Sequence, residues 1–299
     1  MTYKVESCWA GRTLKDYLFS GLSLSRAQVI VLKKKEQGML LNGERVTVRA
    51  LLMEGDLLEL ELEDEQSPED LVPYEYPLQI LYEDEDLILI NKPQGMPTHP
   101  SHGHFEDTLA NALAFYYQKQ GRPFVFRAAN RLDRDTTGVV LIAKNKRASA
   151  ALSKQIIERK VQKEYLALLV GTVKEDEGTI DKNIVRAQDS VIVRKTSETE
   201  GEQAFTSYRV IERKGGLTLV SAIPHTGRTH QLRVHFASIG HPIFGDGLYG
   251  SPSELICGQA LHAQSLSFCH PVSGELLTVR ASLHLPFISL LKEYGFEFS

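Results

Sequence analysis

The stretch AANRLDRDTTGVVLIAKN, residues 128 to 145, joins a charged segment directly to an apolar one. Its second half, GVVLIAK, is short and rich in branched residues, which predicts a buried β-strand. In its first half, Asp133 stands between Arg131 and Arg134, and Asp135 follows. Nearby guanidinium groups favour the ionised form of a carboxyl group, and an ionised carboxylate suits a nucleophile or a base.

The same residues are also compatible with an ordinary surface turn. In that interpretation Asp135 or Thr136 only caps the local backbone before Gly138. The stretch alone does not decide between a catalytic acid and a turn, so the rest of the chain has to.

The composition describes a globular protein without a membrane-spanning segment. With 299 residues, 42% of them hydrophobic, the chain is long enough for a full core and a second module. No apolar run approaches the roughly 20 residues that span a bilayer, and the start lacks a signal-peptide pattern, so we expect a cytoplasmic location. The three cysteines, Cys8, Cys257 and Cys269, follow no paired metal or redox spacing, which predicts reduced, packed thiols.

Residues 1 to 62 read as a small separate unit. Thr13 caps a predicted first helix, Ser23 or Ser25 a second, and an Asn42-Gly43 turn separates short strands. Residues 63 to 76 are acidic, contain prolines and lack lysine and arginine, which indicates a solvated linker. Over residues 77 to 299, hairpin-like strand pairs outnumber strand-helix-strand units. We therefore predict an α+β fold with a mixed, largely antiparallel sheet.

A second informative stretch is IPHTGRTHQLRVHFASIGHPIFGDGLYG, residues 223 to 250. We expect Arg228, His230, Arg233 and His235 on one helix that begins near Gly227 and presents a basic face to phosphate. A merely solvated helix face is the alternative. A metal site is a further one, but histidines five residues apart lie about 140° apart around a helix and cannot all converge on one ion.

Tyr165 lies within QKEYLALLVG, a predicted strand that is otherwise mostly apolar at its centre. A tyrosine in such a strand is most often a core residue whose hydroxyl is satisfied at the edge. Only its context in the whole chain suggests another role.

Several separated motifs together resemble one enzyme family. In order, they are RLDRDTTGVVLIAKN, KEYLALLVG, HTGRTHQLRVHFASIGHPIFGDGLYG and LHAQSLSFCHPVSGE. Over roughly residues 77 to 299 they resemble the RluA/RluD family of RNA pseudouridine synthases. The first sixty residues resemble the small RNA-binding module of the alpha-L type that is shared with a ribosomal small-subunit protein and tyrosyl-tRNA synthetases.

The resemblance implies a reaction and a set of site residues. The reaction breaks the bond from ribose to a uracil nitrogen, turns the base and forms a carbon–carbon bond, and it needs no cofactor and no metal. The family's catalytic aspartate falls on Asp133, its active-site tyrosine on Tyr165 and its basic partner on Arg233. Arg131 falls where an arginine fills the gap left by the flipped base. Family members usually have His and Ser where this chain has Asn130 and Thr137.

The implied partner is RNA, ribosomal rather than transfer RNA, bound by a monomer and without a membrane. Because the net charge is −4, affinity must come from local cations. The residues expected to bind RNA are Arg26, Lys33, Lys34 and Lys35 in the small module and Arg131, Arg134, Arg228, His230 and Gln231 in the larger one. Two alternatives stay open, namely a catalytically silent RNA-binding protein and a metal-dependent phosphodiesterase that uses Asp133 and Asp135.

Overall fold

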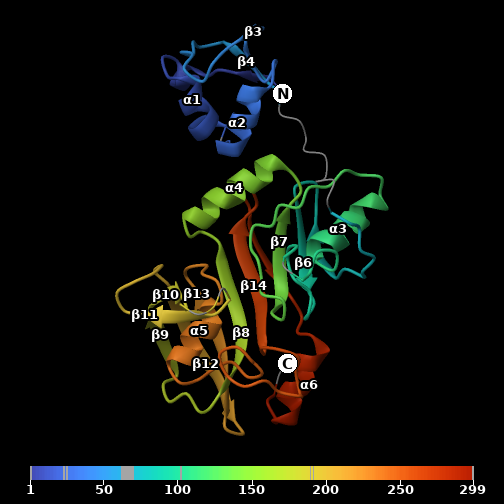
Figure 1. The fold of residues 1–299 in the computed structure, drawn as a ribbon, viewed down its shortest axis with the longest axis vertical. Helices are drawn as coiled ribbons and strands as arrows, with labels where there is room; N and C mark the ends of the chain where they lie inside the picture. Colours follow the sequence, from blue (N-terminus) through green and yellow to red (C-terminus); the bar gives the residue numbers. More distant parts are fainter. Residues whose placement is uncertain are drawn as a thin grey trace. The chain divides into compact units, whose positions relative to one another are not determined.

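A computed structural model of the protein describes residues 2–22, 24, 26–61, 71–101, 103–188, 190 and 192–297, without the side chains of residues 20, 26–28 and 31. The chain divides into two compact units, residues 1–66 and 67–299, which are labelled in Figure 1 and treated separately below. The predicted caps Ser23 and Ser25, and most of the predicted linker, lie outside the described residues.

The first unit packs short helices on a small antiparallel sheet. Its elements are β1 (Thr2–Lys4), a 3₁₀ turn (Ser7–Trp9), α1 (Leu14–Asp16), a π-helical turn (Tyr17–Gly21), α2 (Arg26–Lys34), β2 (Met39–Leu41), β3 (Glu44–Arg45) and β4 (Leu57–Leu60). The strand order is β1-β4-β2-β3. As predicted, Thr13 caps the first helix, because its Oγ1 accepts the amide of Asp16 at 3.2 Å. The unit has its own buried core, which includes Leu14, Leu18, Leu32 and Leu58.

The second unit is built on a mixed sheet that confirms the predicted α+β class. Among the described residues this sheet has nine strands in the order β5-β6-β7-β14-β8-β13-β12-β9, with β15 paired to β14. Only the β7–β14 pair is parallel in this sheet as described. The strands are β5 (Ile80–Glu83), β6 (Leu87–Lys92), β7 (Thr137–Ala143), β8 (Gln162–Val170), β9 (Glu177–Asp181), β12 (Phe205–Lys214), β13 (Leu217–Pro224), β14 (Leu261–Cys269) and β15 (Leu276–Arg280).

Four helices and a separate hairpin accompany this sheet. They are α3 (Leu109–Gln118), α4 (Lys146–Ile157), α5 (Gln231–Ser238), α6 (Leu285–Glu293) and the hairpin of β10 (Asn183–Arg186) with β11 (Arg194–Ser197). Figure 1 shows β7, β14 and β8 side by side, with α5 beside β13 and the hairpin. The strand predicted after the charged loop is therefore β7, an inner strand of the sheet. The charged loop lines one pocket together with residues of β8 and α5.

The expectations about membrane-spanning segments and about the cysteines can be compared with the structure. No helix among the described residues is both long and apolar enough to cross a membrane. The prediction of packed thiols was wrong, because Cys8, Cys257 and Cys269 are free and exposed. They lie in turns and at a strand end rather than in the core.

Candidate active site

The loop that carries Asp133 is held in place on both sides. Thr98 Oγ1 donates to the carbonyl of Leu132 at 2.9 Å and accepts its amide at 3.2 Å. The buried ammonium of Lys92 donates to the carbonyl of Arg134 at 2.9 Å. Asn130 ties the loop to β7, because its amide accepts Leu141 N–H at 2.8 Å and donates to the Val139 carbonyl at 3.0 Å. These bonds fix the backbone on either side of the carboxylate.

Asp133 is paired with an arginine that is distant in sequence. Arg233 Nη1 donates to Asp133 Oδ2 at 3.1 Å. The neighbouring arginines bond elsewhere: Arg134 pairs with Asp135 at 3.1 Å, and Arg131 donates to the hydroxyl of Thr229 at 2.9 Å. The sequence argument from flanking arginines was therefore wrong about which guanidinium contacts Asp133.

A second aspartate, which the sequence argument missed, orients Arg233. Asp246 is fully buried and accepts two parallel bonds from that guanidinium, at 2.7 and 2.8 Å, as well as the amides of Leu248 and Tyr249. Burial works against ionisation, but the Arg233 hydrogen bonds hold the pKa of Asp246 below its ordinary value. Burial likewise disfavours the cation, yet Asp246 and Asp133 raise the pKa of Arg233 above its ordinary value. The arginine is thus a permanent cation in one orientation.

The helix that provides Arg233 differs from the predicted one. It begins at Gln231, and His230 before it adopts a left-handed conformation with a φ of 57°. Arg228 therefore precedes the helix. The helix also presents no basic face, since Arg233 and His235 are both buried. His235 instead hydrogen-bonds Thr206 and the Lys182 carbonyl.

Gln231 is committed to the protein rather than available to a ligand. Its Oε1 accepts Thr226 Oγ1 at 2.7 Å and the Arg228 amide at 3.0 Å. Its Nε2 donates to the Phe205 carbonyl and to Thr206 Oγ1, both at 3.0 Å. These four bonds use the full capacity of the amide, so Gln231 holds the start of α5 in place.

His230 faces Asp133 from the side opposite the loop. Its Nδ1 lies 2.8 Å from the hydroxyl of Tyr249, which also accepts the amide of Arg194 at 2.9 Å. The other ring nitrogen, Nε2, lies 3.9 Å from Asp133 Oδ2. Burial lowers the pKa of His230, with Asp133 acting in the opposite direction. Burial thus favours the neutral form of the ring beside the carboxylate.

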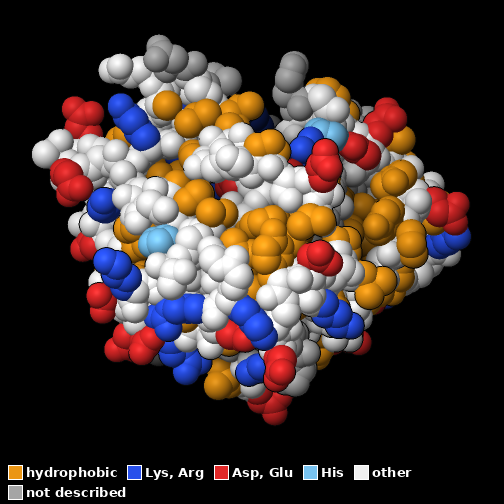
Figure 2. Space-filling view, turned by 90° about the horizontal axis from the view of Figure 1, so that it is seen from below, with side chains coloured by type: hydrophobic (Ala, Val, Ile, Leu, Met, Phe, Trp, Pro, Cys, Tyr) orange, Lys and Arg blue, Asp and Glu red, His pale blue; other side chains and the backbone are white. Residues whose placement is uncertain are grey.

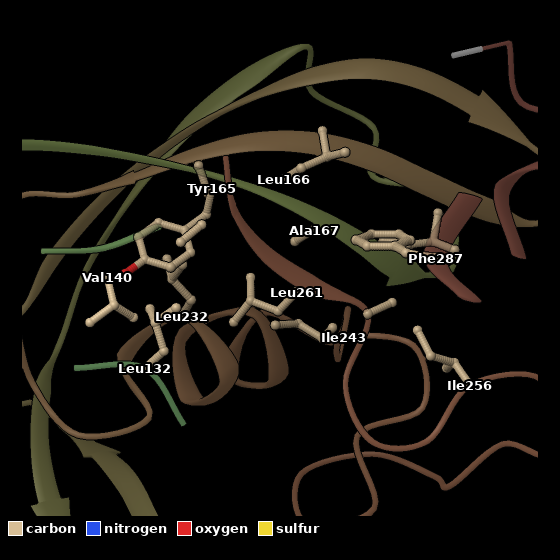
Figure 3. Packing of buried hydrophobic residues seen from close by; sticks show 14 of the residues in the cluster. Leu132, Val140, Tyr165, Leu166, Ala167, Leu232, Ile243, Ile256, Leu261 and Phe287 are labelled. Carbon is tan, nitrogen blue, oxygen red and sulfur yellow. The ribbon is translucent and has the colours of Figure 1, made fainter. Parts of the chain in front are cut away.

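Tyr165 and Asp133 line the same pocket, which has a volume of about 260 Å³. Tyr165 comes from β8 and packs beside Leu132, Val140 and Leu232 (Figure 3). Burial, reinforced by the charge of Asp133, raises the pKa of the Tyr165 hydroxyl. The tyrosine therefore offers a neutral aromatic ring next to an anionic carboxylate and a fixed cation.

The remaining residues predicted to bind RNA are placed as follows. Arg131, Arg228, His230 and Gln231 line the pocket, whereas Arg134 does not. Arg228 is paired with Glu202 at 2.7 Å. In the first unit Lys33 and Lys34 are exposed and Lys35 pairs with Glu61 at 3.6 Å, while the Arg26 side chain lies outside the described residues. On the face seen in Figure 2, acidic and basic side chains are intermixed around apolar areas, and no continuous basic surface covers this face.

Metal binding has little support from the geometry of the described residues. His225, His235 and His241 each hydrogen-bond a different neighbour, Ser207, Thr206 and the Val170 carbonyl. One other group, Asp84, Asp86 and His270, places its ligand atoms within 4.8 Å of one another. However, His270 Nδ1 accepts two backbone amides, so its Nε2 carries the proton it donates to Asp84 and is not free as a ligand.

The two residues that depart from the family pattern both have defined hydrogen-bonding roles. Asn130 ties the loop to β7, as described above, and Thr137 Oγ1 lies 2.7 Å from Nδ1 of the buried His262. Both substitutions therefore preserve polar contacts behind the site. Neither side chain is bonded to Asp133 or Arg233 in the described residues.

Comparison with known proteins identifies the family. A family model described as RNA pseudouridylate synthase matches residues 86–238, a range that contains Asp133, Tyr165 and Arg233. The chain belongs to this family. An uncharacterized RNA pseudouridine synthase of Bacillus subtilis, YjbO, is 38% identical over 280 residues, which cover 94% of this chain and 98% of the relative. The chain is accordingly an RNA pseudouridine synthase, which is an isomerase.

Two further members of the family align well. The ribosomal large subunit pseudouridine synthase D of Vibrio cholerae is 37% identical over 282 residues, which cover 90% of this chain and 82% of that protein. The solved structure of human RNA pseudouridylate synthase domain containing 1 superposes with a TM-score of 0.59 at 30% identity, covering 69% of this chain and 84% of the human one. The mixed sheet described above is thus the fold of the family.

Proposed function

We propose that this protein converts specific uridines of structured RNA, in large-subunit ribosomal RNA, to pseudouridine, with Asp133 as the essential carboxylate. The observation that carries the proposal is the pairing of Asp133 with Arg233 in a pocket that also holds Tyr165. The ribosomal substrate, and a place in the RluA/RluD group, are supported by the similarity to the ribosomal large subunit enzyme of Vibrio cholerae. We further propose that the protein acts as a monomer in the cytoplasm.

The geometry suits a carboxylate that acts on the ribose of an extruded nucleotide. Asp133 lines the pocket; its Oδ2 accepts a hydrogen bond from Arg233, while its Oδ1 has no protein partner among the described residues. A uridine inside a stacked helix cannot reach this depth, so the base must flip out at a cost of a few kcal/mol. Arg131 at the pocket rim can stack in the vacated space, and the Tyr165 ring can hold the uracil.

The reaction balances within the substrate. The bond from the ribose to the uracil nitrogen breaks, the released base turns, the ribose carbon bonds to a ring carbon, and the proton of that carbon moves to the nitrogen. Asp133 either attacks the sugar or takes a proton from it, and the hydrogen bond from Arg233 holds the carboxylate in position for both routes. Because the atoms and electrons of product and substrate are the same, no group donor or redox partner is consumed.

We also propose that the first unit provides RNA affinity through the exposed Lys33 and Lys34 at the end of α2, together with Lys35 and Arg26. Phosphate contacts of this kind bind RNA without reading its sequence. Transfer RNA as substrate, and RNA binding without catalysis, are the competing proposals. The intact trio of Asp133, Tyr165 and Arg233 favours catalysis over silent binding.

The test is pseudouridine formation by variants of Asp133. We expect Asp133→Asn to abolish product under single-turnover conditions while it leaves the fold and much of the RNA affinity intact, because an amide can neither attack the sugar nor take its proton. Unmodified transcripts of large-subunit ribosomal RNA and of transfer RNA serve as substrates, and pseudouridine is mapped in both.

The matched control is Asp135→Asn, which removes a carboxylate two residues away that pairs with Arg134. This variant should keep most of the turnover. Appreciable product from Asp133→Asn, or equal losses in both variants, would contradict the assignment. Modification of the transfer RNA alone would contradict the ribosomal substrate.

A further inference from the structure

Lys163 is a further cation in the active-site pocket, one that sequence reasoning did not assign. It lies on β8 two residues before Tyr165, and side chains two apart on a strand point to the same face. Both line the pocket with Asp133. Glu164 between them points to the other face, where it accepts bonds from Ser221 and Ser265.

In the part of the chain that the structure describes, no acidic side chain supplies a counter-charge to this ammonium group. The side chain is half-buried, and no acid of the described residues forms an ion pair with it. Burial lowers the pKa of Lys163, with no neighbouring carboxylate opposing it, so even Asp133 is too distant to act as its partner. A half-buried cation without a counter-charge slightly destabilises the folded free protein, and a bound anion would offset this cost.

The other pocket cations are already engaged. Arg233 pairs with Asp133 and Asp246, and Arg228 pairs with Glu202. Arg131 bonds only a neutral hydroxyl, that of Thr229, and is the residue proposed to replace the flipped base. Arg131 and Lys163 thus both lack an acidic partner among the described residues. With Arg131 assigned to the space left by the base, Lys163 is the cation available to an anionic ligand inside the pocket.

We propose that Lys163 binds the phosphodiester of the target nucleotide itself. This inference rests on the proposed function, because phosphate is the anionic group of RNA. The Cα atoms of Lys163 and Tyr165 are roughly 6.6 Å apart along the strand, comparable to the separation of a nucleobase from its own phosphate. The ammonium also lies against the loop at Gly227, where a Cβ would come within 3.9 Å of Lys163 Nζ. Tyr165 and Lys163 thus hold the base and the backbone of one extruded uridine.

The experiment measures RNA binding and stability of Lys163→Met in the full-length protein. With a transcript of large-subunit ribosomal RNA, affinity should fall by roughly 10- to 100-fold, the usual worth of one charge-assisted hydrogen bond. The slope of log affinity against log salt should shrink by about 0.7 to 0.9, as expected for one phosphate. The melting temperature of the free protein should stay the same or rise, because the methionine lacks an uncompensated charge.

Two further variants serve as controls. Lys160→Met removes an exposed lysine nearby that pairs with Glu158 at 2.7 Å, and it should leave affinity and slope unchanged. Lys163→Arg keeps the charge and should retain most of the affinity, and Lys163→Gln replaces the methionine variant if the latter fails to fold. Unchanged binding by Lys163→Met, an equal loss in Lys160→Met, or a drop of several degrees in melting temperature would overturn the assignment.

A neutral backbone locates the contact. A hairpin oligonucleotide with a methylphosphonate beside the mapped uridine should bind the wild type more weakly than the natural hairpin, whereas Lys163→Met should not distinguish the two. Equal discrimination by both proteins would overturn the proposal. If the wild type forms no pseudouridine in any transcript, the proposed function fails; if the wild type is active and Lys163→Met binds like it, only this inference fails.

Discussion

Replacing Asp246 by Asn should cost both stability and turnover. The buried carboxylate of Asp246 accepts two bonds from Arg233 and two from backbone amides. Removing one partner of a buried ion pair typically costs 3 to 5 kcal/mol, and we expect about 3 because the amide oxygen still accepts part of these bonds. For a unit of this size, each kcal/mol lowers the melting temperature by about 2 to 4 °C, which gives a decrease of about 6 to 12 °C.

The comparison variant is Asp176→Asn, which breaks an arginine–aspartate pair at the surface of the same unit. Asp176 lies 2.8 Å from Arg213 but its side chain is 86% exposed, so this loss should be below about 1 kcal/mol. Melting curves of both variants, with single-turnover pseudouridine yield at a temperature where both are folded, form the assay. If Asp246→Asn melts within about 2 °C of the wild type, or turns over normally, the buried pair does not orient Arg233.

Three further predictions concern other parts of the chain. Replacing Lys33, Lys34 and Lys35 by Gln should weaken binding of any RNA and lower the salt slope by about 0.7 to 0.9 per lost phosphate, and an unchanged slope would contradict their role. A chain that begins at Ser67 keeps its own core and should melt cooperatively with weaker RNA binding; failure to fold would contradict the separation into units. Burial lowers the pKa of Lys92 from 10.5 to about 7, although the charges of Asp135 and Asp133 act in the opposite direction. Between pH 7 and pH 10.5 the unfolded chain therefore binds more protons than the folded one, and the free energy of unfolding should rise with pH over this range. The free energy of unfolding, measured by denaturant at pH 7 and pH 9, should rise in the wild type and rise less in Lys92→Met. An equal rise in both proteins would contradict the prediction.

The strands of the second unit were predictable because their periodicity and branched residues are local signals. The segment GVVLIAK at residues 138 to 144 corresponds to β7 (Thr137–Ala143), whose side chains are all buried. The start of α5 was not predictable in this way. His230 takes a left-handed backbone conformation, which residues other than glycine rarely adopt, and the helix therefore begins only at Gln231.

The prediction of a basic face on α5 was wrong, because the charge of its residues suggested a surface that contacts phosphate. Arg233 is buried only because Asp246, 13 residues later in a glycine-rich loop, meets it from another part of the fold. Lys92 is buried because its ammonium donates to three backbone carbonyls, of Pro93, Met96 and Arg134. Periodicity cannot reveal partners of this kind, since loop carbonyls and loop acids carry no regular spacing. The family resemblance suggested Asp133, Tyr165 and Arg233 as site residues, and these three line one pocket, but it did not indicate the residues that hold them in place.

The two aspartates at Arg233 show how burial can separate positioning from chemistry. Asp246 has no exposed side-chain surface, and its carboxylate accepts hydrogen bonds from Arg233 and from two backbone amides, so it holds the guanidinium without being able to reach a ligand. Asp133 has a 29% exposed side chain and one oxygen without a protein partner among the described residues, so it can reach the substrate. Because Arg233 is fixed by Asp246, its hydrogen bond holds the Asp133 carboxylate in place at little cost in flexibility. Arg233 therefore lies between the buried Asp246 and the partly exposed Asp133. This arrangement holds the Asp133 carboxylate in a fixed position, as the proposed isomerisation requires.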